Sequence, residues 1–224
     1  APVPTNRRTE PRTAGPAMLA PRTARVALVA VLVVSALLRF ALSAQGGQYY
    51  FGDENRYDRG LKLYQALAHA DFPMARTIAA LPEHALFVWV GAAVSAGQHA
   101  LAQLTPFGDW RQPGHLLSTM WLAAALLSLF SVLNLFLVHR LARAAGADER
   151  EALWVLLLFA VANTAFYYSR HLLPYDCALA ATLAALVVGV RAPTLPRAFV
   201  CGLLGGLTYG LYNGYWYLIP VVWL

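Results

Sequence analysis

The chain has 224 residues, of which 59% are hydrophobic and only 12% are charged. A soluble globular domain carries roughly 25% charged residues, and here the charges are missing from several long apolar runs and concentrated between them. This distribution is typical of a polytopic membrane protein. The net charge of +6 does not indicate nucleic-acid binding, because the basic residues lie beside apolar runs rather than on one amphipathic face.

The motifs of several enzyme classes are absent from the sequence. It contains no Walker loop, dinucleotide-binding fingerprint, HExxH or CxxC, so neither nucleotide chemistry nor zinc proteolysis is indicated. The two cysteines, Cys177 and Cys201, lie inside apolar runs. They are expected to be small buried apolar residues rather than a disulfide or a metal-binding pair.

The segment 1–23 is rich in proline, threonine and arginine and has no apolar period, so it is predicted to be a disordered basic tail. The apolar run that follows predicts a first membrane span over 24–43. A cleaved signal peptide is the alternative, but the apolar run 26–42 is longer than the about 7–15 residues of a signal-peptide core. Arg39, near the end of this span, is expected to extend toward the membrane surface.

The rest of the chain continues the pattern of apolar runs separated by short polar segments. The sequence therefore predicts an all-α fold, a polytopic transmembrane helix bundle of about five spans within 24–224. Residues 44–115 are predicted to be its first extracytoplasmic loop, with juxtamembrane surface helices. Asn134, inside the second span, is expected to make an interhelical hydrogen bond. The four further candidate spans are 116–138, 152–168, 174–190 and 199–224.

The segment 84–104 is apolar enough to cross, but it carries His84, Gln98 and His99, which suit a membrane interface. If it does not cross, the arginine-rich loops further on share the cytoplasmic side with the basic tail; if it crosses, they move outside. Only the first topology obeys the positive-inside rule. The segment is therefore predicted to lie along the outer surface or to be re-entrant, with a plain sixth span as the alternative. The loop arginines are Arg140, Arg143, Arg150, Arg191 and Arg197.

The densest charge cluster follows the first span directly, in YYFGDENRYDRGLKLY at 49–64. Asp53 and Arg56 are i,i+3 neighbours and are expected to pair, while Glu54 points about 100° away from Asp53. Asp53 and Tyr57 share one helical face. Aromatic residues interleave the charges, as in an interfacial helix that handles an amphipathic substrate. A solvated loop face is the alternative interpretation.

A second polar group lies in the turn SRHLLPYD at 169–176, on the same outer side under the predicted topology. Pro174 is favoured at the first position of a helix, which places Asp176 in the first turn, where the helix dipole stabilises its charge. Arg170 and His171 could bind a phosphate. Interfacial anchoring of these two residues and a plain helix-start acid are the alternatives. The two charged groups are predicted to converge on one site.

These residues resemble a known family. A first span followed by Asp53-Glu54-Asn55-Arg56-Tyr57 is similar to the integral-membrane GT-C glycosyltransferases, and most similar to the aminoarabinose transferase of lipid A and the protein O-mannosyltransferase-like family 39. The stretch LPEHALFVW at 81–89 resembles a Phe-Glu-Lys-Pro-Pro-like motif of the aminoarabinose transferase branch, in which Glu83 matches and His84 replaces the lysine. Ser169-Arg170-His171 with Asp176 resembles the family's Ser-Arg…Asp turn.

The resemblance implies a fold of eleven or more spans, of which this chain would be the N-terminal part. It also implies a multi-pass protein of an inner or plasma membrane, with a cytoplasmic N-terminus and a polyprenyl-phosphate sugar donor at the outer face. The acceptor, a lipid, glycan or protein, is left open. In the implied inverting transfer, Asp53 acts as general base with Glu54 beside it. The implied contacts are Arg56, Arg170 and His171 to the donor phosphate, Tyr57, Glu83 and His84 to substrate, and Asp176 with Asp53 to a divalent metal, if one is used.

Two other function classes stay open from the sequence. A transporter places ionisable residues near the bilayer midplane, whereas the acids here gather toward one surface. A non-catalytic, lipid-binding subunit on the same scaffold is the other alternative. Membrane lipid is an expected partner in each case.

Overall fold

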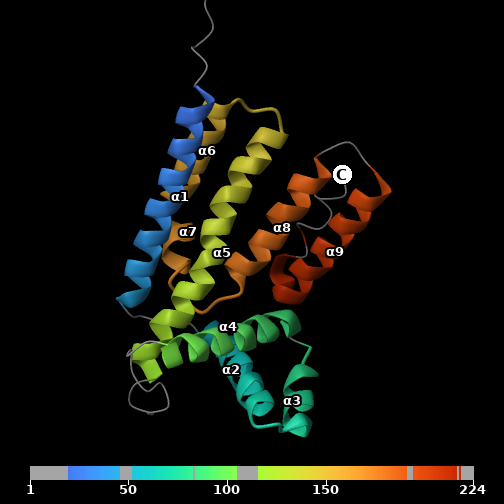
Figure 1. Cartoon of the computed structure of the whole chain (residues 1–224). Coiled ribbons are helices and arrows are strands. Elements are labelled where there is room, and N and C mark those ends of the chain that lie inside the picture. The colour runs from blue at the N-terminus through green and yellow to red at the C-terminus, as the bar shows by residue number, and fades with distance from the viewer. Residues whose placement is uncertain are drawn as a thin grey trace, which may run out of the picture.

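The structure, a computed structural model, describes residues 20–45, 52–82, 84–104, 116–190, 194–215 and 217. Every regular element within these ranges is helical, which confirms the predicted all-α class. Most of the predicted tail, residues 1–19, lies outside the described residues. The elements, labelled in Figure 1, are α1 (Pro21–Ala44), η1 (Gly52–Glu54), α2 (Asn55–Ala68), α3 (Phe72–Ala79), α4 (Ala85–Leu104), α5 (Leu116–Ala144), α6 (Glu149–Ala160), α7 (Asn163–Tyr168), α8 (Tyr175–Gly189), α9 (Leu195–Leu211) and η3 (Asn213–Tyr215).

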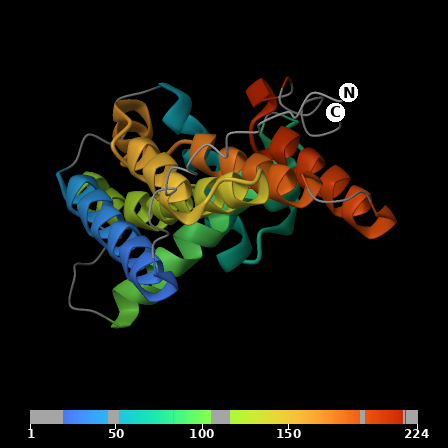
Figure 2. The same ribbon diagram turned by 90° about the horizontal axis from the view of Figure 1, so that it is seen from above.

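The helices form two parts. The bundle consists of α1, α5, α6, α8 and α9, which run side by side, and α4 crosses one end of it with α2 and α3 beyond (Figure 1). We call α2, α3 and α4 the platform. Seen from above, α1 lies at one edge of the bundle and α9 at the opposite edge (Figure 2). The bundle therefore has a platform end and a far end, and the start of α8 lies toward the platform.

Two helices are long and apolar enough to cross a membrane: α1 and the part of α5 from Met120 to Ala144. The helices α8 and α9, together with residues Ala85–Leu101 of α4, are apolar but shorter. Large apolar side chains cover the outside of α1, where Val26 is 63% and Leu37 is 62% exposed, and a surface of this kind fits contact with lipid. The structure thus shows two candidate spans, and crossing by the shorter helices stays a prediction.

Two of the predicted spans differ from the helices observed. The predicted 152–168 span is divided between α6 and α7, because the chain leaves the helix at Val161 and Ala162. The predicted 199–224 span corresponds to α9, which begins earlier, at Leu195, with Pro196 in its first turn, a position where proline is favoured. The helix ends at Leu211, since Tyr212 is extended, with φ −152°.

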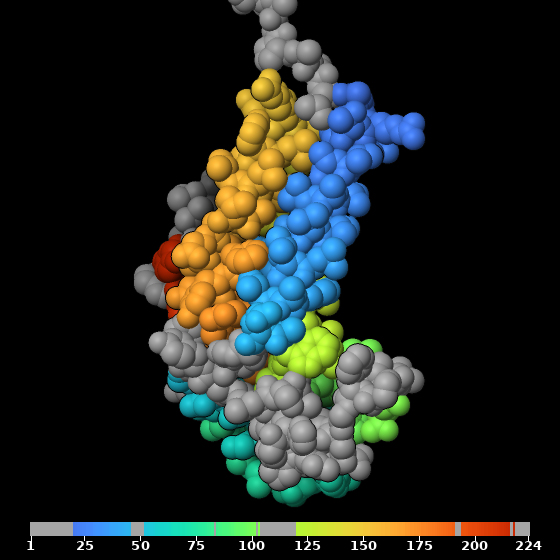
Figure 3. All heavy atoms as spheres, turned by 90° about the vertical axis from the view of Figure 1, so that its left-hand side faces the viewer, coloured from blue at the N-terminus to red at the C-terminus, as the bar shows by residue number. Residues whose placement is uncertain are grey.

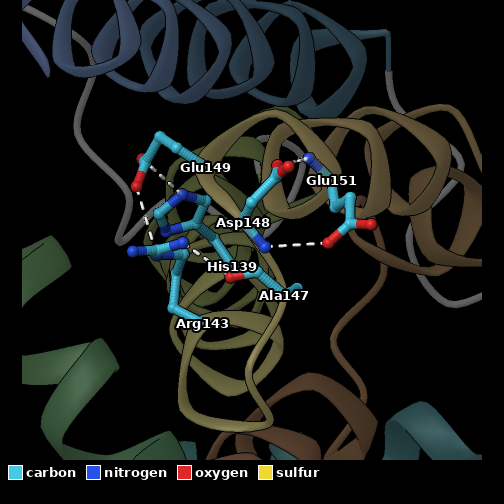
Figure 4. Close-up of polar contacts among 6 residues, drawn as sticks. All are labelled: His139, Arg143, Ala147, Asp148, Glu149 and Glu151. Carbon is cyan, nitrogen blue, oxygen red and sulfur yellow. Dashed lines mark hydrogen bonds and ion pairs between the residues drawn. The ribbon is translucent and has the colours of Figure 1, made fainter. Parts of the chain in front are cut away.

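The far end of the α5–α6 pair is fixed by a compact polar turn (Figure 4). Asp148 and Glu151 form a capping box at the start of α6, each carboxylate accepting from the other residue's backbone N–H at 2.8 Å. Glu149 joins α6 to α5, because its two oxygens lie 3.2 Å from His139 Nε2 and 3.1 Å from Arg143 Nε. Along the rest of their length α1 and α6 lie side by side on one face (Figure 3).

The platform depends on close packing of α2 against α4. Tyr57 is fully buried there, and its hydroxyl lies 3.1 Å from Ser95 Oγ of α4. Gly60 faces Gly91 so closely that a Cβ added to Gly60 would lie 2.7 Å from the Gly91 Cα. Because neither residue has a side chain, the two helix backbones touch, and this contact positions the start of α2, where the charge cluster lies.

Candidate functional site

The charge cluster after α1 meets the turn before α8. Leu172 N donates to Glu54 Oε1 at 2.8 Å, and Tyr175 Oη donates to Asp53 Oδ2 at 2.9 Å, across separations of 118 and 122 residues in the chain. The predicted convergence of the two polar groups on one end of the bundle is therefore confirmed. The chemical roles of these residues stay predictions.

Asp53 presents a partly open carboxylate. Its side chain is 46% exposed, and Arg56 Nη2 lies 3.3 Å from its Oδ1, so the expected i,i+3 pair is confirmed. Tyr175 binds the other carboxylate oxygen. These two contacts orient the group, and its exposed surface leaves it accessible to a reacting molecule.

Glu54 occupies the opposite environment. Its side chain has no exposed surface, and its Oε1 accepts from Leu172 N at 2.8 Å and lies 3.4 Å from His171 Nδ1. A carboxylate without exposed surface cannot touch a substrate in this conformation. In this conformation Glu54 holds the 169–174 turn against the start of α2, and its predicted catalytic role beside Asp53 stays a prediction.

The turn itself carries His171 inside and Arg170 nearer the surface. His171 is only 2% exposed and lies between Glu54 and Arg170, whose Nε is 3.4 Å from His171 Nε2. The Arg170 guanidinium also lies over the Tyr167 ring, 5.0 Å from its centroid. The His171 ring is buried in this conformation, whereas Arg170 and Arg56 keep partly exposed side chains. The phosphate contact predicted for the three residues stays a prediction.

Two residues predicted to contact substrate are buried packing residues instead. Tyr57 lies in the α2–α4 interface, and burial raises the pKa of its phenol to about 12. His84, with a positive φ of 52°, places its Nδ1 3.2 Å from the Leu211 carbonyl and stacks on Tyr212. Neither side chain is open to solvent in this conformation, and direct substrate contact by either residue stays a prediction. Glu83, the third predicted contact, lies outside the described residues.

Asp176 points into the bundle. Its Oδ1 accepts from Asn134 Nδ2 of α5 at 3.2 Å, which confirms the interhelical hydrogen bond expected for Asn134. Arg39 of α1 is fully buried and donates from Nε to Ser131 Oγ of α5 at 3.0 Å, so its predicted extension to the surface is wrong. These bonds join α1 to α5 and α5 to α8 inside the bundle.

The divalent metal that the resemblance allows at Asp53 and Asp176 stays a prediction. Among the described residues, no group of three or more His, Cys, Asp and Glu side chains is arranged to hold a metal ion. The two carboxylates also bind different partners, Tyr175 and Asn134.

Tyr175 is surrounded by aromatic residues that were not predicted at the site from the sequence. The ring of Tyr212 lies 4.9 Å from that of Tyr175, and Tyr168 packs edge-on against it at 5.7 Å. The sequence signal for Tyr175 is its place directly after Pro174. Pro174 is the N-cap of α8 rather than its predicted first residue, so Tyr175 begins the helix at the end that faces the charge cluster. From the sequence, Asp176 is the only residue predicted to have a functional role in the first turn of this helix.

A cavity of about 890 Å³ lies among α2, α3 and α4. The described residues that line it include Lys62, His69 and His99 but neither Asp53 nor Tyr175. We do not assign the chemistry to this cavity on its size alone, because the residues that join the two polar groups do not line it.

No protein-family model matches the chain, and neither the curated proteins nor the solved structures contain a significantly similar one.

Proposed function

We propose that this chain is part of a membrane glycosyltransferase of the GT-C type, which transfers a sugar from a polyprenyl phosphate to a hydroxyl acceptor. The observation that carries the proposal is the half-exposed Asp53 carboxylate, oriented by Tyr175 and Arg56 where two polar segments meet at one end of an apolar bundle. The resemblance of Asp53-Glu54-Asn55-Arg56-Tyr57 to that class supports it. Glycosyl transfer with inversion needs one such base.

The proposed reaction assigns the proton to Asp53. The acceptor hydroxyl attacks the anomeric carbon, its proton passes to Asp53, and the bond from that carbon to the phosphate oxygen breaks. A positioned base of this kind contributes roughly 10²–10⁴-fold in rate. Tyr175 and Arg56 hold the Asp53 carboxylate in one orientation. Holding a catalytic group in a fixed orientation lowers the entropic cost of reaching the transition state.

The leaving group in this proposal is a polyprenyl phosphate. Its negative charge is stabilised by nearby positive groups, so its departure does not need a strong general acid. Arg56, which pairs with the proposed base, and Arg170, in the facing turn, both keep exposed surface, and guanidinium groups match phosphate oxygens with paired donors. Glu54 and His171 act as positioning residues, because Glu54 binds the turn that carries Arg170.

We also propose that all five bundle helices cross an inner or plasma membrane, with the N-terminus cytoplasmic and the platform outside. The arrangement of the bundle and the crossing direction of α4 support this topology (Figure 1). The positive-inside distribution of arginines favours the same orientation.

The proposal is tested by Asp53→Asn in the longest reading frame that encodes this chain. Membranes containing the variant are supplied with a polyprenyl-phosphate sugar, and sugar transfer to endogenous acceptors is measured. We expect the rate to fall by at least 10²-fold, because asparagine keeps the shape but cannot take the proton.

The matched control is Asp58→Asn, which removes one negative charge from α2, five residues further along the chain. It is expected to retain transfer. Wild-type turnover in Asp53→Asn, with both proteins equally abundant in the membrane, would remove the role given to Asp53.

A transporter is the second candidate, favoured by the buried polar network of Arg39, Ser131, Asn134 and Asp176, because ionisable residues inside a membrane bundle often mark a transport path. Against it, Arg39 lies five residues before the end of α1 and Asp176 in the first turn of α8, both near the platform end. Sugar flux into vesicles without covalent transfer would favour this candidate over the glycosyltransferase.

A further inference from the structure

The cavity of about 890 Å³ in the platform has no role in the proposed chemistry. It lies among α2, α3 and α4, in the part of the molecule that extends beyond the bundle (Figure 1). Its volume is near the upper end of the about 300–1,000 Å³ that small-molecule sites occupy. Lys62, the first described residue of the lining, follows Asp53 by nine residues, which corresponds to about 14 Å along a helix. The cavity is therefore a second candidate site and not a part of the first.

Charged groups of both signs line this cavity. Lys62 belongs to α2, and Asp71 is the N-cap of α3, where its Oδ1 accepts from Met74 N at 3.1 Å. Within the described parts of the chain, no carboxylate forms an ion pair with Lys62. Because one ammonium and one carboxylate line the same space, the lining favours neither a simple anion nor a simple cation.

Neutral polar side chains add donors and acceptors to the same lining. Gln65 and Tyr64 both line the cavity, and neither side chain hydrogen-bonds to another residue that the structure describes. His69, also in the lining, contacts the Gln65 carbonyl through Nδ1 at 2.8 Å, so its Nε2 points to a different partner. An amide and a phenol each donate and accept hydrogen bonds. A ligand rich in hydroxyl groups, which also do both, is complementary to this set.

The lining also has an apolar component. The Tyr64 ring lies against that of His99, with centroids 6.0 Å apart, and α3 contributes Met74, which is 51% exposed, and Ile78. A sugar ring carries C–H groups on its faces and hydroxyl groups around its edge. It can therefore pack on an aromatic ring and on aliphatic side chains while its hydroxyl groups bind polar ones. A hydrocarbon chain would leave the polar groups of the lining without partners.

We propose that this cavity binds a carbohydrate, in the form of an oligosaccharide of neutral sugars. Lys62 donates to sugar oxygens, Asp71 accepts from sugar hydroxyls, and Gln65 does both. Tyr64 and Met74 pack against the faces of the rings. The proposal does not depend on glycosyl transfer, because binding needs no base and the described lining contains neither part of the Asp53–Tyr175 pair.

The test is oligosaccharide binding by the purified chain in phosphatidylcholine nanodiscs. Maltotriose, mannotriose and chitotriose are added separately at millimolar concentrations, and binding is measured by saturation-transfer difference NMR. We expect at least one of these trisaccharides to bind. Lys62→Met and Gln65→Ala should each weaken that binding about two- to tenfold, because each removes a hydrogen bond to the sugar.

Arg76→Met and Gln103→Ala are the matched controls, since they remove the same kinds of group from exposed positions of α3 and α4 outside the described lining. Both should bind the sugar as the wild type does. Ala68→Trp keeps every polar group of the lining and fills the space, so it should lose the sugar, and circular dichroism checks that each variant is helical. Asp53→Asn should bind normally, which separates this result from the fate of the proposed function.

Three results would overturn the proposal. The first is that none of the trisaccharides binds. The second is that Lys62→Met and Gln65→Ala bind as well as their controls, because the sugar would then lie elsewhere on the chain. The third is displacement of the sugar by inorganic phosphate at the same concentration, which would identify the cavity as an anion site.

Discussion

Asp53 and Glu54 are neighbours in the sequence, but they occupy opposite environments. The first is 46% exposed and the second is fully buried. Both acids lie in η1, the 3-10 turn before α2, which rotates successive side chains by about 120°. One acid therefore turns outward and the other turns toward Leu172. One residue can then offer a carboxylate to a substrate while the next holds the turn that completes the site.

The buried phenol of Tyr57 predicts how the free energy of unfolding depends on pH. Burial raises the pKa of its phenol to about 12, against about 10 in an unfolded chain. Between these values the folded protein holds the proton more tightly than the unfolded chain, so the free energy of unfolding should fall as pH rises, by about 1.4 kcal/mol per pH unit from this group. Below pH 10 its contribution is constant.

The comparison with Tyr57→Phe isolates that group. The variant loses the bond to Ser95 Oγ, worth about 1 kcal/mol, so at pH 8 it should be less stable than the wild type. As pH rises from 10 toward 12 the difference should shrink and then reverse, because phenylalanine does not titrate. Unfolding in mixed micelles measured from pH 8 to 11.5 gives both curves, and curves that stay parallel would contradict the prediction.

At the scale of elements, the contact between α2 and α4 depends on two glycines. A methyl group added at Gly60 would lie 2.7 Å from the Gly91 Cα and 2.8 Å from the Val88 carbonyl oxygen, and neither backbone atom can move without shifting a helix. Gly60→Ala is therefore expected to lower the free energy of unfolding by about 1–3 kcal/mol. Thermal unfolding in detergent measures the effect.

The same substitution at Gly206 in α9 is the matched control. An added Cβ there meets nothing within 4 Å, so the higher helix propensity of alanine should leave stability unchanged or raise it by up to about 1 kcal/mol. Opposite signs for the two variants are the expected result. Equal effects would mean that α2 and α4 do not approach as closely as described.

The sequence predicted those elements whose signal is local. The apolar runs located α1, α5 and α8 to within a few residues, and the i,i+3 spacing predicted the Asp53–Arg56 pair. The ends of α6 and α9 were missed, because Val161 and Tyr212 leave the helix inside runs that are still apolar. Hydropathy indicates whether a segment is apolar enough to lie in lipid or in a protein core, but it does not indicate where a helix ends.

At the scale of the whole molecule, the burial of the polar residues could not be predicted, because it depends on residues far away in the chain. Arg39 is buried by α5 and its Ser131, and Glu54 by a turn 118 residues later. Either residue looks suited to a surface when only its own helix is considered. The meeting of the two polar groups could be predicted, because it follows from helices that alternate in direction along the chain. Which of the two acids is exposed could not, because that depends on how distant residues pack.

The proposed topology makes a prediction about the two ends of the bundle. Between Ala80, in the platform, and Ala145, after α5, the chain contains α4 and α5. If only α5 crosses, the two positions lie on opposite sides of the membrane; if α4 crosses as well, they lie on the same side. This parity separates the surface-helix topology from the six-span alternative without any assumption about function.

Single-cysteine labelling measures that parity. Cys177 and Cys201, both buried, are first replaced by alanine, and Ala80→Cys and Ala145→Cys are then made one at a time at exposed positions. An impermeant maleimide applied to intact cells should label position 80 at once and position 145 only after the membrane is opened, because α4 lies across the bundle end rather than along it (Figure 1). Labelling of both positions from outside would show that α4 crosses and would move Arg140 and Arg197 to the outer leaflet. Labelling of position 145 alone would invert the molecule and place Asp53 in the cytoplasm, where a donor presented at the outer face could not reach it.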